Sequence, residues 1–394
     1  MRKLIVAGAL LALVIPAMAS ANTARTSALA SGDARFLPDD SRTTEDFPGR
    51  IHEHQRITFE NVDPNTSSSS REERGSWGGF TMEHERVNGT IGWFVDRPHA
   101  ARKHQLYSQP RFDQFGAEKA AHSQVTPASS IVDLFWGNES WGFTGAFGMS
   151  SEEFLDDETT DPLDSETKSN MMFDVVLGKN LASGTEVAAN FFMSRFGELD
   201  GDEQNPNAFG FGANLRHPME LAFFNHLVAG GAFFKDLKFS DSDSVDGRTA
   251  FTVDANLLNF TKAGGEAMGG GSDDLTYLLA LGVGLTSGKE EGVEDRTTTI
   301  QLPKATAGAE LDVASWLTVR GSVTHSWNWR SDGDNSLTGG SNGSGVSTTL
   351  GAGLHWGRLT MDMVVNNGLL TAGPNFVGGG TPGVANFVTL DWAL

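Results

Sequence analysis

The chain has 394 residues, no cysteine and a formal net charge of −21. The lack of cysteine excludes disulfides, thiolate metal sites and a cysteine nucleophile, and the acidic balance excludes a sequence-independent nucleic-acid binder, which needs many cations. Glycine (47), phenylalanine (26) and tryptophan (9) are frequent, while the mean hydropathy is only −0.26. This composition favours strands and turns, and after the N-terminus no apolar run is long enough for a transmembrane helix.

Residues 1–21 have the three parts of a secretory signal peptide. Arg2 and Lys3 form a basic start, Leu4 to Ala17 is apolar, and Ala19 to Ala21 is a small-x-small cleavage signal. The apolar run is shorter than the ~20 residues that span a bilayer, which argues against an uncleaved anchor. We therefore expect export and cleavage after Ala21, with Ala19 as the alternative.

Residues 22–76 form a polar N-terminal segment with almost no apolar period. It contains the acidic pair Asp39-Asp40 and the serine run Ser67 to Ser70. Two interpretations remain open: a disordered leader, or a plug folded into the lumen of a barrel. One short piece, Arg56 to Val62, has the pattern of a strand, but we place the barrel domain at residues 77–394.

From Trp77 onward the sequence repeats one pattern, in which apolar and polar residues alternate as they do along a β-strand. Leu275 to Thr286 is the clearest example, because six apolar residues share one face. In the hairpin from Lys304 to Arg330, Glu310 and Arg320 become cross-strand neighbours of opposite charge. Most candidate strands have about the 9–11 residues that a tilted membrane strand needs, which is longer than strands in soluble sheets.

The connectors alternate between short and long along the chain. Short periplasmic turns and longer external loops are typical of outer-membrane barrels. Two connectors, Arg216 to His226 and Asn259 to Asp274, are longer than this rule allows, and Ser287 to Pro303 is expected to be an external loop. The pattern predicts an all-β, transmembrane, antiparallel up-and-down barrel of about fourteen strands, with twelve or sixteen as alternatives.

The last strand carries a resemblance to a known family. In NFVTLDWAL, apolar residues alternate up to the last residue of the chain: Val388, Leu390, Trp392 and Leu394. This segment resembles the C-terminal assembly signal of bacterial outer-membrane β-barrels, although Leu394 stands where that family usually has an aromatic residue. The resemblance implies a porin-like channel or transporter in the outer membrane of a Gram-negative bacterium. It also implies contact with the barrel-assembly machinery, outer-membrane lipid and lipopolysaccharide.

The sequence contains no complete motif for catalysis, phosphate binding or metal binding. The glycine-rich stretches lack the context of a phosphate-binding loop, and no His-x-Ser pair suggests a hydrolase. Asp241 and Asp243 are weak candidates for a divalent cation, because the full spacing of a calcium loop is missing. We expect no enzyme activity, no cofactor and no dedicated metal site.

The charged residues predicted to face the lumen suggest a selectivity. In the assigned register acids outnumber bases on the inner face, and a lumen lined by one sign of charge concentrates the opposite ion. The residues expected to line the lumen and set selectivity are Asp174, Glu186, Asp254, Glu310, Arg320, Asp362 and Asp391. In the alternative, these acids pair with arginines and leave a neutral lining.

Three functions are consistent with these sequence patterns. We expect first a porin-like channel for passive diffusion of small solutes, with a preference for cations. The second is a transporter of hydrophobic molecules such as fatty acids or aromatic hydrocarbons, which inward phenylalanines at Phe191-Phe192 or Phe233-Phe234 would favour. The third is a surface barrel that acts as an adhesin or structural protein. The sequence predicts neither the solute nor the oligomeric state.

Overall fold

The computed structural model describes ten stretches of the chain. They are residues 23–62, 76–95, 130–155, 165–196, 207–236, 248–263, 275–290, 296–332, 345–365 and 385–394. The predicted signal peptide and the weak metal candidates Asp241 and Asp243 lie outside the described residues.

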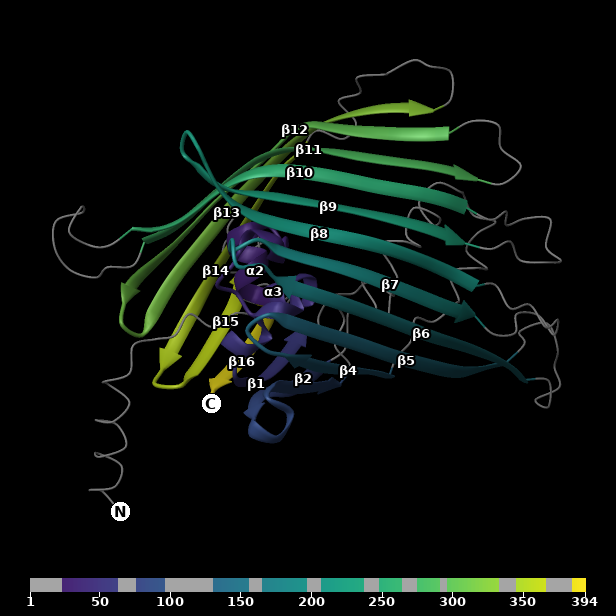
Figure 1. The fold of residues 1–394 in the computed structure, drawn as a ribbon, viewed down its shortest axis with the longest axis horizontal. Helices are drawn as coiled ribbons and strands as arrows, with labels where there is room; N and C mark the ends of the chain where they lie inside the picture. The colour runs from purple at the N-terminus through teal and green to yellow at the C-terminus, as the bar shows by residue number, and fades with distance from the viewer. Residues whose placement is uncertain are drawn as a thin grey trace, which may run out of the picture.

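Sixteen antiparallel strands form one closed barrel in the described part of the chain (Figure 1). Each strand pairs with its neighbours in sequence, so the topology is up-and-down. The strands are β1 (Arg56–Val62), β2 (Ser76–His84), β3 (Gly89–Val95), β4 (Ser130–Gly137), β5 (Trp141–Leu155), β6 (Ser165–Asn180), β7 (Glu186–Phe196), β8 (Asn207–Leu221), β9 (Phe224–Asp236), β10 (Arg248–Ala263), β11 (Leu275–Glu290), β12 (Arg296–Ala314), β13 (Leu317–Asp332), β14 (Gly345–Trp356), β15 (Leu359–Val365) and β16 (Ala385–Ala393). The predicted all-β barrel is confirmed, with sixteen strands as in one of the stated alternatives.

Strand β1 closes the barrel by pairing with β16. Arg56 is the register partner of Ala393 and Val62 that of Phe387, while the other edge of β1 pairs with β2. The predicted start of the barrel at residue 77 is therefore wrong: the first strand begins at Arg56. Closure leaves no unpaired strand edge, which would otherwise expose a row of backbone donors and acceptors.

Several strands are longer than the sequence pattern predicts. Strand β12 has 19 residues, and β11 and β12 cover residues 287–290 and 296–303 of the stretch Ser287 to Pro303, for which the pattern predicts a loop. Strand β8 runs to Leu221 and β9 begins at Phe224, so the long connector expected at Arg216 to His226 is a tight turn. In both places the polar ends of strands lack apolar alternation, although their backbones continue the hydrogen-bonded ladder.

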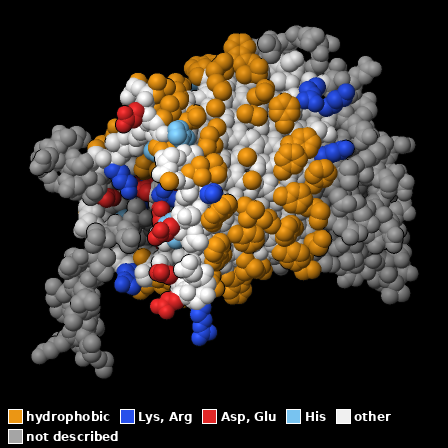
Figure 2. Space-filling view, in the orientation of Figure 1, with side chains coloured by type: hydrophobic (Ala, Val, Ile, Leu, Met, Phe, Trp, Pro, Cys, Tyr) orange, Lys and Arg blue, Asp and Glu red, His pale blue; other side chains and the backbone are white. Residues whose placement is uncertain are grey.

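Large apolar side chains cover the outside of the barrel. On β11, Tyr277, Leu281 and Val283 point outward and are exposed, whereas Leu278 and Ala280 point inward and are buried. Figure 2 shows the outward residues as a broad apolar band around the visible strands. None of the helices among the described residues is long and apolar enough to cross a membrane.

The N-terminal residues fold into short helices inside the ring of strands (Figure 1). They are α2 (Thr23–Ala30), η1 (Ala34–Phe36), α3 (Thr43–Asp46) and η2 (Pro48–Glu53). Helix α2 packs on β12 to β16, and η2 packs on β4 to β6, which lie on another part of the wall. Asp33 caps η1 by accepting a hydrogen bond from the Arg35 amide at 3.1 Å, and Pro48 begins η2. We call residues 23–55 the plug.

Candidate functional site

Apolar side chains of the plug are buried against apolar patches of the inner wall. Leu29, Phe36 and Leu37 are at most 1% exposed and form one cluster with the wall residues Val228, Leu258, Leu278 and Ala280. An apolar patch is unfavourable on the wall of a water-filled lumen, and the lumens of transmembrane barrels are polar. The wall of β9 to β11 is therefore built to hold the plug.

Two further apolar contacts fix the other half of the plug. Phe47 packs on Val176 and Ala188 of β6 and β7. Ile51, which is fully buried, forms a second cluster with inward aromatic residues of β2, β3 and β4: Trp77, Phe94 and Phe135. Fully burying a side chain of this size contributes about 1.5–3 kcal/mol. Together, the three apolar clusters hold the plug against the inner wall of the barrel.

Glycines in the wall make room for the plug backbone. A Cβ atom added at Gly308 would lie 2.0 Å from the carbonyl oxygen of Leu29, and one added at Gly142 would lie 1.9 Å from that of Pro48. Both distances are far below contact, and a backbone oxygen cannot rotate away as a flexible side chain can. At these positions the shape of the wall therefore depends on glycine.

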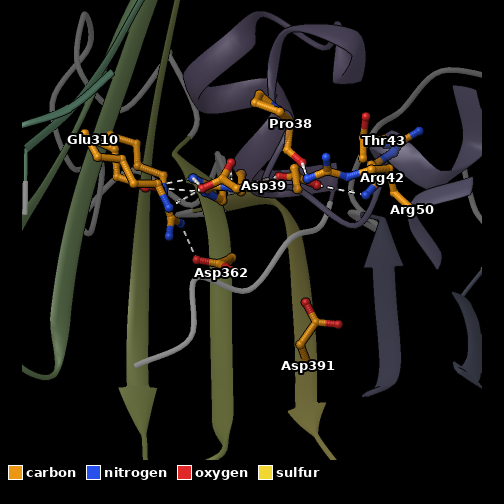
Figure 3. Close-up of polar contacts among 12 residues, drawn as sticks. Pro38, Asp39, Arg42, Thr43, Arg50, Glu310, Asp362 and Asp391 are labelled. Atoms are coloured by element: carbon orange, nitrogen blue, oxygen red, sulfur yellow. Dashed lines mark hydrogen bonds and ion pairs between the residues drawn. The ribbon is translucent and has the colours of Figure 1, made fainter. Parts of the chain in front are cut away.

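Arg25 is the centre of a buried ionic cluster between plug and wall. Figure 3 shows its partners Asp39 of the plug and Glu310 of the wall facing each other. Arg25 Nε and Nη2 donate to the two carboxylate oxygens of Glu310 on β12, each at 2.9 Å. Its Nη1 also donates to Asp39 at 3.2 Å and Asp40 at 3.3 Å within the plug. On the wall, Arg320 pairs with both Glu310 and Asp362. The charges alternate along this chain of contacts, so each buried charge has an opposite neighbour.

Two more arginines of the plug reach acids of the wall. Arg35 binds Asp254 on β10 with two hydrogen bonds of 3.0 Å and also binds Asp33 of the plug. Arg50 donates to Glu186 on β7 at 2.8 Å. Three plug arginines thus hold three acids on three different strands, which fixes the plug in rotation as well as in depth.

Arg216 of β8 lies on the wall beside Glu186, the acid that binds Arg50, and also contacts the plug directly. It pairs with Glu186, and its Nη1 donates to the carbonyl oxygen of Arg35 and to the hydroxyl of Thr43, each at 3.0 Å. Its guanidinium also lies 4.7 Å from the ring centroid of Phe47, a cation–π distance. One wall side chain therefore contacts three parts of the plug.

The buried position of the plug shifts the pKa values of its own acids. Burial alone would raise the pKa values of Asp33 and Asp39, but the adjacent arginines, Arg35 and Arg25, outweigh burial and lower both. Burial dominates at Asp40 and raises its pKa to about 7, despite Arg25. Burial and the nearby Arg56 lower the pKa of His54 to about 3. The plug is therefore held by charged pairs, and one of its acids titrates near neutral pH.

The seven residues expected to line the lumen all lie on the inner face of the barrel, but most of them do not line an open passage. Glu186, Asp254 and Glu310 bind the plug, and Asp362 pairs with Arg320. Their carboxylates are paired with arginines, as in the alternative of a neutral lining. In this structure these four acids hold arginines, and their role in ion selectivity stays a prediction.

The remaining predicted acids lie apart from the three anchors. Asp174 is buried on β6. Asp391 on β16 accepts a hydrogen bond from the Thr58 hydroxyl and has Arg56 Nη1 at 4.0 Å, so it joins the two strands that close the barrel. Figure 3 shows Asp391 separated from the cluster at Glu310.

The C-terminal residues have the orientation that their alternation predicts. Leu390, Trp392 and Leu394 are exposed on the outside, Val388 is partly buried, and Thr389 and Asp391 between them are buried on the inside. Sequence reasoning missed the plug arginines Arg25, Arg35 and Arg50. The available signal was weak, since the segment carries several arginines and scattered large apolar residues but no period.

No group of three or more potential metal ligands occurs among the residues that the structure describes. No protein-family model and no curated protein matches the sequence. Among solved structures, the chain is similar to the siderophore receptor PirA from Pseudomonas aeruginosa, with 10% sequence identity, a TM-score of 0.26, and coverage of 86% of this chain and 79% of that one. A TM-score this low carries no conclusion about function, which rests on the barrel and its plug.

Proposed function

We propose that the chain is an integral barrel of a bacterial outer membrane. The outward apolar face of β11 supports this, because it runs from Leu275 to Leu285 without a polar residue on the outward positions. Ten residue steps of about 3.4 Å give about 34 Å along the strand, or about 26 Å of height at a tilt of about 40°. That height matches the apolar band of transmembrane barrels, which is about 25 Å.

Within this membrane, the barrel acts as a gated transporter of small solutes and not as a permanently open pore. The observation that carries the proposal is the set of three arginines, Arg25, Arg35 and Arg50, that tie the plug to acids of the wall. Passage of a solute requires the plug to move, at least in part. Ion pairs and apolar contacts can release and re-form, whereas a covalent bond cannot, and the chain has no cysteine. No catalytic step is assigned.

We assign the cation preference to the open state of the barrel, in which the plug has moved. Release of the three arginines would leave Glu186, Asp254 and Glu310 on the wall, with Arg216 and Arg320 as bases beside two of them. Cations would then be favoured over anions at the acids that lost a partner. A hydrophobic solute is a second candidate, because Phe192 points inward and packs on Ala250, although Phe191 points outward.

Planar-bilayer recordings test the gated transporter. The variant combines Arg25→Gln, Arg35→Gln and Arg50→Gln, and the matched control is Arg358→Gln in the exposed turn between β14 and β15. The wild type and the control should be closed for most of the time, while the triple variant should show stepwise, cation-preferring openings. Equal, steady conductance of all three proteins would contradict a gating plug, and silence of the triple variant would favour a barrel without transport.

A further inference from the structure

Three basic residues lie in one row on the outside of the barrel. Lys235 of β9 and Lys289 of β11 are both register partners of Thr249 on β10, and Lys289 is the partner of Arg296 on β12. Neighbouring strands are about 4.8 Å apart, so the row spans about 15 Å. All three basic side chains are exposed. We call Lys235, Lys289 and Arg296 the cation row.

A row of aromatic and hydroxyl side chains lies two residues closer to the middle of the barrel. Phe233 pairs with Phe251, Phe251 with Ser287, and Ser287 with Thr298. Arg296 lies over the Phe251 ring at 5.7 Å from its centroid, and the hydroxyl oxygens of Ser287 and Thr298 are 3.0 Å apart. A row of cations therefore lies above one row of aromatic and hydroxyl side chains at one edge of the apolar band, and Figure 2 shows basic side chains at its border.

The cation row has the height of a lipid headgroup. Lys289 follows Leu285, the last residue of the apolar face of β11, by four residues along the strand. Four steps of about 3.4 Å at a tilt of about 40° place its backbone about 10 Å above Leu285. The headgroup layer extends about 5–7 Å beyond the hydrocarbon core on each side of the membrane, so the backbone of Lys289 lies just above it and the lysine side chain is long enough to reach into it.

Among the residues that the structure describes, the cation row has no anionic side chain paired with it. Lys289 and Arg296 face each other directly, and like charges in this position destabilise a sheet. No ion pair joins Lys235 or Lys289 to a side chain in the described parts of β8 to β13. An external anion would offset this local repulsion.

We propose that the cation row binds the phosphorylated headgroup of a lipid, whose acyl chains lie on the apolar face below it. The inference rests on the proposed insertion in the outer membrane. The phosphate oxygens accept from the two ammonium groups and the guanidinium, and the sugar or glycerol hydroxyls of the headgroup lie near Thr298. Ser287 is buried and accepts from Arg296 at 3.4 Å, so it supports the guanidinium from below. Phe233 and Phe251 mark the boundary between headgroup and acyl chains, as aromatic girdles do.

Native mass spectrometry of the full-length protein tests the site. The protein is released from nanodiscs that contain lipid A with two phosphates, lipid A with one phosphate, or phosphatidylethanolamine. The variant combines Lys235→Gln, Lys289→Gln and Arg296→Gln, and the control combines Lys179→Gln and Arg358→Gln at the other end of the barrel. One cation near an anionic surface strengthens binding roughly fivefold, so the triple variant should lose about a hundredfold in affinity for lipid A with two phosphates.

Three outcomes would overturn the proposal. They are equal binding of lipid A with two phosphates by the triple variant and the wild type, no preference of the wild type for this lipid over phosphatidylethanolamine, and complete displacement of the lipid by millimolar inorganic phosphate. The last result would indicate a site for free anions. Migration on a gel before and after boiling shows separately whether each variant forms a barrel. Loss of the barrel in the wild type would refute membrane insertion, whereas a folded barrel without lipid preference would refute only this site.

Discussion

Replacing Arg25 by glutamine should weaken the docking of the plug without unfolding the barrel. Arg25 is fully buried, and it donates to Glu310, Asp39 and Asp40. Glutamine carries no charge and cannot reach all three acids. The substitution therefore leaves buried carboxylates with fewer cations, which costs more than the loss of an exposed salt bridge.

The size of the effect follows from the contacts that remain. Breaking a buried ion pair from one side costs about 3–5 kcal/mol, and Glu310 keeps Arg320, so the lower end of this range applies. Each 1.4 kcal/mol is a factor of ten, which predicts an increase of about a hundredfold in the undocked population. The apolar contacts of Leu29, Phe36, Leu37, Phe47 and Ile51 remain. The plug should therefore stay docked for most of the time.

The rate of thiol labelling measures this population, because the protein has no cysteine of its own. Ala30 is 1% exposed in the docked plug, so a cysteine placed there by Ala30→Cys reacts only after undocking. The labelling rate should rise about a hundredfold when Arg25→Gln is added to this background, and it should stay unchanged with Arg358→Gln. A change of less than about threefold for Arg25→Gln would refute the role of Arg25 as an anchor.

Three other predictions concern packing, pH and assembly. Gly308→Ala should weaken docking by about 1–3 kcal/mol, measured by the same labelling, because its Cβ would meet the carbonyl oxygen of Leu29; an unchanged rate would mean that the plug does not touch this wall. The pKa of Asp40 is raised to about 7 in the docked plug, so its contribution is present at low pH and is lost as the pH rises through 7. Between about pH 4 and 7, labelling of the Ala30→Cys protein should accelerate by up to about tenfold per pH unit more than labelling of the same protein with Asp40→Asn, and above pH 7 the two profiles should level to a constant ratio. A constant ratio over the whole range would contradict this. The double variant Trp392→Asp and Leu394→Asp places charges on the outward face of β16 and should block assembly; normal heat-modifiable migration on a gel would contradict the outward assignment.

The barrel could be predicted because its pattern is local. In β11, residues two apart along the chain share a face, so the alternation from Leu275 to Leu285 already gives the outward side. The hairpin of β12 and β13 could also be aligned, and Glu310 and Arg320 are register partners as expected. The ends of the strands were harder to predict, since β12 extends into polar sequence beyond the apolar band.

The plug could not be predicted in the same way, because its contacts are not local. Arg25 and Glu310 are 285 residues apart in the sequence, and nothing near either residue indicates the other. Leu29, Phe36 and Ile51 have no regular spacing, since each packs on a different part of the wall and not on one shared face. Arg56 to Val62 had the pattern of a strand, but only its pairing with β16 shows that it belongs to the barrel.

A reversible crosslink tests most directly whether the plug closes the lumen. Ser31 of the plug and Ser322 of β13 have hydroxyl oxygens 3.2 Å apart, so Ser31→Cys and Ser322→Cys can form a disulfide in a protein without other cysteines. The crosslink is placed in the variant that lacks Arg25, Arg35 and Arg50. Its counterpart within the wall is Thr306→Cys with Thr324→Cys, whose hydroxyl oxygens are 3.0 Å apart on β12 and β13. If the plug closes the lumen, oxidation silences the conductance of the plug-to-wall pair, reduction restores it, and the wall-to-wall pair conducts in both states. Conductance that is indifferent to the plug-to-wall crosslink would contradict this closure.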